Sequence, residues 1–152
     1  MNSSDTDSDS VAIQNIIARR GTEFVKERLA DSNSEDEDTL TIVSNAGIHP
    51  IPEDYIRGEI YIASTGNLDF SSIETVQIEY DNIIRQLHLK LLEKNWREVY
   101  LFPFGHSTLC MAIKLAVFRT LRIETVDIFY FGNGRYDFLR RNTRDTIASS
   151  RS

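Results

Sequence analysis

The sequence predicts a protein of the α/β class, with a mostly parallel sheet flanked by helices and a disordered acidic tail at the N-terminus. From residue 39 onward, short segments rich in β-branched and aromatic residues alternate with segments of helical periodicity. This order favours right-handed crossovers between parallel strands. The last strand-like segment, 126–131 (VDIFYF), shows little alternation, which is typical of a sheet covered on both faces.

Length and charge set limits on the function. The chain has 152 residues and 41% hydrophobic content, enough for the core of one domain. The formal net charge is −6, but residues 1–40 hold ten acids and four bases, so the remainder is neutral. Without a basic surplus, we expect no binding of duplex nucleic acid through many phosphates, whereas a small polyanion held by a few side chains fits.

The N-terminal part divides into a tail, a helix and a linker. Residues 1–10 have no large apolar side chain after Met1, so we expect them to be disordered. Residues 11–30 have apolar residues at helical spacing and predict a short helix, weakened at Gly21. Residues 31–38 (DSNSEDED) form an acidic linker. We therefore divide the chain into 1–38, an α/β domain at 39–141, and a polar C-terminal tail at 142–152.

The first half of the domain has two strands and a long helix. We predict strands at 39–43 and 59–63, separated by a loop that holds two of the three prolines. Ser71 and Glu74 form a candidate capping box. Apolar residues then follow at intervals of 3 and 4 as far as Leu91, which predicts a long amphipathic helix.

The second half has two further strands around a buried helix. We predict a strand at 99–102 that ends at Pro103, and an apolar helix at 109–117. The strand at 126–131 runs into Gly132-Asn133-Gly134. We expect the tail from residue 140 to keep no more than about one helical turn.

Small and polar residues follow three of the four strands, at the edge of the sheet where α/β proteins bind ligands. Glycines let a ligand approach the backbone, hydroxyls and amides donate hydrogen bonds, and the helix that starts near Ser107 directs its positive end to the same edge. Arg135 would pair with a phosphate and Tyr136 would stack on a base. In the alternative interpretation these residues only close turns, and Tyr136 covers the sheet edge. The candidate ligand-binding residues are Ser64, Thr65, Asn67, Gly105, His106, Ser107, Thr108, Arg135 and Tyr136.

Several common sites are excluded. The sequence has no Walker A motif and no G-x-G-x-x-G, and Leu109 stands where the G-x-S-x-G motif needs its last glycine. The three histidines are scattered, so we expect no metal and no cofactor. His106 and Cys110 lie four residues apart, but Cys110 belongs to the most apolar stretch, and we favour an inert core thiol over a nucleophile. We expect no catalytic residue.

The cysteine content, the apolar runs and the N-terminus predict the cellular location. Cys110 is the single cysteine and cannot form an internal disulfide, which favours a reducing compartment. No apolar run approaches the roughly 20 residues that span a bilayer, and the N-terminus does not look like a signal peptide. We therefore expect a cytoplasmic protein with no membrane partner.

Residues 58–141 resemble one half of a SAVED domain, a group related to the Rossmann-like CARF domains. The resemblance covers a little over half of the chain. It rests on GEIYIASTGNLD, on REVYLFPFGHSTLCMAIKLAVF with its Leu-Phe-Pro and Ala-rich helix, and on VDIFYFGNGRYDF with its tyrosine at 136.

The resemblance implies a sensor of a cyclic oligonucleotide that activates a separate effector in prokaryotic antiviral defence. A SAVED domain holds two such units, so a complete site would need a homo-oligomer or a second sensor or effector subunit. Two alternatives stay open. One is a phosphodiesterase that degrades the nucleotide with the help of His106 and Ser107, and the other is a ligand-free adaptor that binds a partner through its N-terminal helix.

Overall fold

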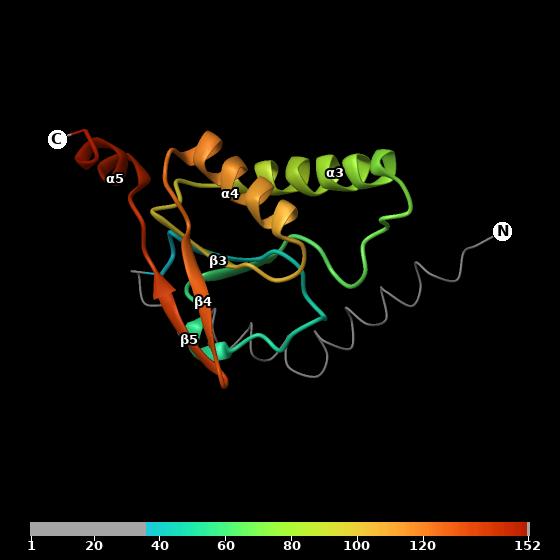
Figure 1. Cartoon of the computed structure of the whole chain (residues 1–152), viewed down its shortest axis with the longest axis horizontal. Coiled ribbons are helices and arrows are strands. Elements are labelled where there is room, and N and C mark those ends of the chain that lie inside the picture. Colours follow the sequence, from blue (N-terminus) through green and yellow to red (C-terminus); the bar gives the residue numbers. More distant parts are fainter. Residues whose placement is uncertain (1–35, 152) are drawn as a thin grey trace.

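The computed structural model describes residues 36–151 as one five-stranded sheet with two long helices on one face (Figure 1). The strand order is β2-β1-β3-β4-β5. The first four strands are parallel and β5 pairs antiparallel with β4. The predicted α/β class with a mostly parallel sheet is confirmed. The strands are β1 (Thr39–Val43), β2 (Glu59–Ile62), β3 (Glu98–Phe102), β4 (Val126–Gly132) and β5 (Arg135–Leu139).

The connections between the parallel strands lie on the two faces of the sheet. Helix α3 (Ile73–Leu91) connects β2 to β3, and α4 (Ser107–Leu121) connects β3 to β4. Both helices lie side by side on one face, where Tyr80 contacts Thr108 and His88 contacts Thr120. The connection from β1 to β2 runs in the opposite direction across the sheet and holds only the short helix η1 (Glu53–Tyr55). The chain direction therefore reverses between β1 and β3, which makes their carboxyl ends the switch point of the sheet.

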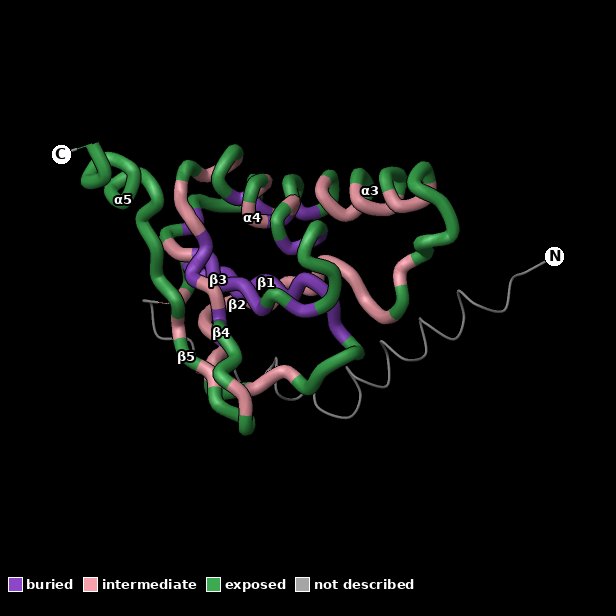
Figure 2. The backbone as a smooth tube through the Cα atoms, viewed as in Figure 1, coloured by how far each residue is buried: buried purple, intermediate pink, exposed green. Residues whose placement is uncertain are grey.

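Each face of the sheet has its own apolar core, and the central strands are buried (Figure 2). On the helical face Leu40 and Ile42 of β1 pack against Leu87, Leu109 and other residues of α3 and α4. On the opposite face Val43 and Phe102 pack with Ile56 and with the partly buried Tyr136 and Phe138 of β5. No long helix covers this second face. The β4–β5 hairpin and the 48–58 segment cover it instead.

Strand β5 was not predicted from the sequence. The sequence predicts that the last strand ends at Gly132-Asn133-Gly134, but Asn133 and both glycines have positive φ and form a tight hairpin turn. After the turn, Tyr136 and Phe138 face the core while Arg135 and Asp137 are exposed. This alternation of apolar and polar residues is the ordinary pattern of a half-buried strand.

Two helix boundaries also differ from the prediction. Helix α3 is capped by Ser72, which accepts a hydrogen bond from the Thr75 amide, and not by Ser71. The Ser71 amide instead donates to Asp69 in the preceding turn. The C-terminal tail forms α5 (Thr143–Ser149), a longer helix than the single turn expected, with Asn142 as its cap.

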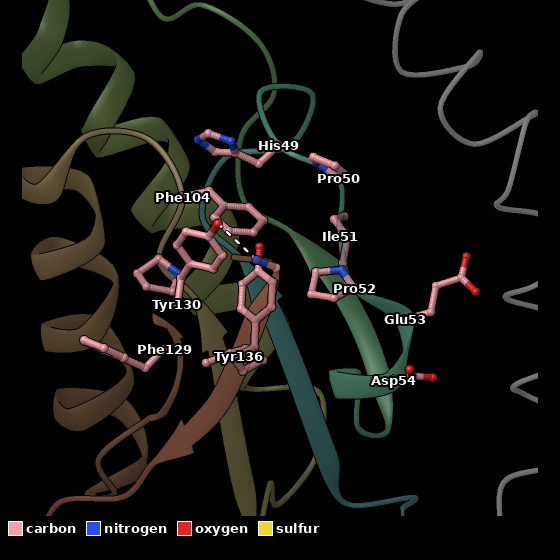
Figure 3. A pocket seen from close by; sticks show the side chains of 13 residues that line it. His49, Pro50, Ile51, Pro52, Glu53, Asp54, Phe104, Phe129, Tyr130 and Tyr136 are labelled. Atoms are coloured by element: carbon pink, nitrogen blue, oxygen red, sulfur yellow. Dashed lines mark hydrogen bonds between the residues drawn. The ribbon is translucent and has the colours of Figure 1, made fainter. Parts of the chain in front are cut away.

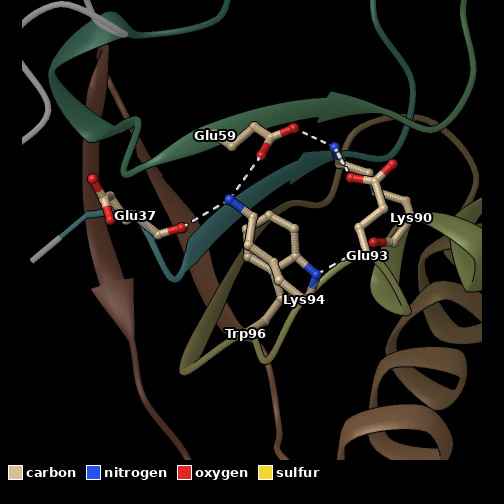
Figure 4. Close-up of polar contacts among 6 residues, drawn as sticks. All are labelled: Glu37, Glu59, Lys90, Glu93, Lys94 and Trp96. Carbon is tan, nitrogen blue, oxygen red and sulfur yellow. Dashed lines mark hydrogen bonds and ion pairs between the residues drawn. The ribbon is translucent and has the colours of Figure 1, made fainter. Parts of the chain in front are cut away.

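The expected disordered tail, the helix at 11–30 and most of the acidic linker lie outside the described residues. At 36–38 the chain enters beside the end of α3, where Lys94 donates to the Glu37 carbonyl (Figure 4). Lys90 bonds Glu59 and Glu93, and the Trp96 indole donates to the Lys90 carbonyl. These contacts fasten the amino-terminal ends of β1 and β2 to α3. Within residues 36–151 no helix is long and apolar enough to cross a membrane.

Candidate functional site

A pocket of about 880 Å³ opens at the carboxyl ends of β3 and β4, on the sheet face without long helices (Figure 3). Its volume lies in the range of small-molecule sites. One wall is the 49–54 segment and the other is the β4–β5 hairpin. The lining residues are His49, Pro50, Ile51, Pro52, Glu53, Asp54, Pro103, Phe104, Ile128, Phe129, Tyr130, Gly134 and Tyr136.

One hydrogen bond joins the segments that form the two walls, and ring contacts order the aromatic lining. The Tyr55 hydroxyl donates to the Tyr136 carbonyl at 2.8 Å, which joins η1 to β5. The rings of Tyr130 and Tyr136 lie 5.0 Å apart, and those of His49 and Phe104 lie 5.4 Å apart. The aromatic surfaces are thus fixed by neighbouring rings before any ligand arrives.

The second part of the site is the switch point between β1 and β3. Asn45 follows β1, is 2% exposed, and donates through Nδ2 to the Gly66 carbonyl at 2.9 Å. Its Oδ1 is buried and has no hydrogen-bond partner among the described residues. Ser64 donates to the Ser44 carbonyl at 2.6 Å, so the turn after β2 is fastened to the end of β1.

Helix α4 begins at this switch point. Its N-cap is His106, which makes no side-chain capping bond, and its first turn holds no acidic residue. The His106 ring lies 4.1 Å from the Phe70 ring, and the Thr108 hydroxyl contacts Tyr80. An uncapped helix N-terminus attracts an anion because its first amide groups lack partners within the helix.

The structure places the nine predicted ligand-binding residues in two regions. Ser64, Thr65 and Asn67 follow β2, and Gly105, His106, Ser107 and Thr108 follow β3. Asn45 bridges these two groups, because its Nδ2 bonds Gly66 and its side chain lies against Gly105. Arg135 and Tyr136 lie instead on β5, beyond β4. Of the nine, Tyr136 lines the pocket.

The sequence interpretation missed His49, Phe104, Tyr130 and Asn45. Phe104 lies directly after the predicted strand at 99–102, and His49 lies in the predicted loop between 43 and 59. No local pattern shows that the loop after β1 crosses the sheet and meets a hairpin about 80 residues later. Asn45 did carry a signal, because an amide directly after a buried strand is a usual ligand position in α/β proteins.

The polar groups of the pocket differ from those of the switch point. Glu53 and Asp54 lie at the pocket's rim, and His49 is exposed at its upper edge. The pocket itself thus suits an uncharged ring with hydrogen-bond donors more than a phosphate. No group of three or more His, Cys, Asp or Glu side chains within residues 36–151 is arranged to hold a metal ion.

Cys110 lies in the core behind the switch point. Its Sγ is 3.5 Å from Ser44 Oγ and 3.6 Å from the Phe104 carbonyl. Burial raises the pKa of the Cys110 thiol. These contacts agree with the interpretation of an inert core thiol.

Comparisons of the chain with protein-family models, with curated proteins and with solved structures found no match.

Proposed function

We propose that this chain is a cytoplasmic sensor subunit that binds a cyclic oligonucleotide, with one base held in the aromatic pocket. The observation that carries the proposal is the pocket itself. It lies at the ligand-binding edge of a parallel sheet, and the rings of Phe104, Tyr130 and Tyr136 line it. Aromatic rings bind nucleic-acid bases by stacking, at about 1–3 kcal/mol per base.

A phosphate of the same ligand would lie at the start of α4. Pro103 and Phe104 line the pocket, and the 105–108 loop follows them directly in the chain. The uncapped N-terminus of α4 supplies amide groups and a positive dipole end for the phosphate. Arg135, exposed on the hairpin, would reach a second phosphate.

The resemblance of residues 58–141 to SAVED and CARF-like domains supports the choice of ligand. It makes cyclic di-, tri- and tetranucleotides the first compounds to test and suggests signalling to a separate effector as the role.

Isothermal titration calorimetry of the full chain against that panel tests the proposal. We expect one member to bind, and Tyr130→Ala to weaken it at least about 10-fold through the loss of one stacking surface. Leu139→Ala is the matched control, because Leu139 is a partly exposed apolar residue of the same hairpin that does not line the pocket. No heat of binding across the panel, or equal losses in both variants, would overturn the proposal.

A further inference from the structure

A second pair of rings lies at the start of α4, outside the pocket. The ring centroids of Phe70 and His106 are 4.1 Å apart, and the ring planes are tilted by 56°. The two rings therefore form a corner and not a parallel stack. Phe70 is 41% exposed and His106 is also exposed, so the outer sides of both rings are open to a ligand. Neither residue lines the pocket.

The loop before α3 holds the Phe70 ring in place. The Asp69 amide donates to Glu79 Oε2 at 3.0 Å, and the Ser71 amide donates to Asp69 Oδ1 at 2.8 Å. Phe70 thus lies between two residues whose amides are hydrogen-bonded, so its ring is positioned before any ligand arrives. The Phe70 ring has no hydrogen-bond donor for a phosphate. A flat base is therefore the part of a nucleotide that fits against it.

The corner is close enough to the pocket for one ligand to reach both. Phe104 lines the pocket, and His106 follows it two residues later. Two residues of fully extended chain span at most about 7 Å, which limits the distance between the Phe104 and His106 α carbons. Gly105 between them is exposed and has no side chain to separate the two places. Successive nucleotides of one strand rise by about 3.4 Å when their bases are stacked and lie further apart when the bases are splayed.

We propose, on the basis of the nucleotide binding proposed for the pocket, that Phe70 and His106 form a second base site. The ligand lies across the carboxyl end of β3, with one base in the pocket and the next base in the corner. The phosphate between the two bases meets the first amide groups of α4, which lack partners within the helix. The two bases are splayed onto separate aromatic surfaces. The ligand is therefore a nucleotide with at least two bases, and a mononucleotide fills only half of the site.

Calorimetry of the full chain with the 5′-phosphorylated dinucleotides pApA, pGpG, pCpC and pUpU, and with the four matching mononucleotides, tests the proposal. We expect at least one dinucleotide to bind about 10-fold more tightly than its mononucleotide, because the second base adds a stacking contact. Phe70→Ala should remove this gain and leave the mononucleotide affinity unchanged. Ile73→Ala is the matched control, since Ile73 is an exposed apolar residue three positions further along, at the start of α3.

Two further variants cover the case in which Phe70→Ala disturbs the loop. Phe70→Leu keeps an apolar side chain without a ring and should lose the gain, whereas Phe70→Tyr keeps a ring and should retain it.

Three results overturn the proposal. They are equal affinities for each dinucleotide and its mononucleotide in the wild type, equal gains in Phe70→Ala and Ile73→Ala, and no binding of any of these compounds. The proposed function is judged separately, by the cyclic panel and by the effect of Tyr130→Ala on it. A ligand that depends on Tyr130 but not on Phe70 would leave the pocket as a base site and remove the second site.

Discussion

The side-chain amide of Asn45 donates a hydrogen bond of 2.9 Å to the carbonyl oxygen of Gly66, so the carboxyl ends of β1 and β2 are joined by one buried side chain. Backbone bonds run alongside it, from Ala46 to Ser64 and from Gly66 to Ala46. On the side toward β3, Gly105 lies directly against Asn45. Asn45 therefore positions the turns that follow β2 and β3, and a substitution of Gly105 should affect both turns.

Gly105→Ala should destabilise the protein by about 2–4 kcal/mol, from a left-handed backbone and from steric overlap together. Gly105 has φ +83°, and an added Cβ would lie 3.0 Å from the Asn45 Cβ and 3.2 Å from Nδ2. Gly132→Ala is the control, because Gly132 has φ +90° and no atom within 4 Å of an added Cβ. Urea denaturation of both variants separates the two causes. Equal losses of stability would show that the contact with Asn45 contributes nothing.

Acid should weaken the ion pair between Glu98 of β3 and Arg140, which follows β5. Burial acts to raise the pKa of the Glu98 carboxyl, but hydrogen bonds from Arg140 and Tyr100 outweigh it, and the pKa lies below its ordinary value of 4.5. A lowered pKa in the folded state means that the stability from ionised Glu98 is complete above pH 4.5. That stability is lost as the pH falls through the folded-state value.

The free energy of unfolding measured from pH 7 to pH 3 tests this. In Glu98→Gln the fall in stability below pH 4.5 should be shallower than in the wild type, and Tyr100→Phe should give a smaller change in the same direction. An unchanged slope in Glu98→Gln would mean that other carboxyls cause the acid sensitivity.

Much of the fold could be predicted because its elements carry their own local patterns. The strand predicted at 39–43 has the bounds of β1, because TLTIV is rich in β-branched residues and a polar turn follows it, and the structure buries all five residues. Helix α3 was predicted from apolar spacing that continues for five turns. Its cap lies one residue later than predicted, because only Ser71 has the Glu of a capping box three residues on, whereas in the structure Ser71 contacts Asp69 and Ser72 caps the helix.

What the sequence could not show depends on contacts between distant segments. The pocket exists because the loop after β1 crosses the sheet and because β5 folds back beside β4. Tyr55 and Tyr136 are 81 residues apart, and nothing in either neighbourhood predicts their hydrogen bond. Strand β5 could have been found, since Asn133-Gly134 is a common hairpin signal and the segment after it, 135–139, alternates between apolar and polar residues. The prediction of parallel strands was enough to place Ser64 and Gly105 at the same edge of the sheet, because each residue follows the carboxyl end of a strand.

Cys110 should be almost unreactive in the folded protein. Its thiol is buried behind the switch point, burial raises its pKa, and its contacts are with Ser44 and the Phe104 carbonyl. Alkylation needs a thiolate that the reagent can reach. Burial blocks the reagent, and the raised pKa keeps the thiol protonated. Iodoacetamide at pH 8 should therefore label the native chain at least about 100-fold more slowly than the chain in urea, where the thiol has an ordinary pKa near 8.5.

Thr108→Cys provides the positive control, since residue 108 is exposed at the start of α4 and should be labelled at once. Labelling of native Cys110 at a comparable rate would contradict the buried, inert thiol and would make a nucleophilic pair with His106 the better interpretation.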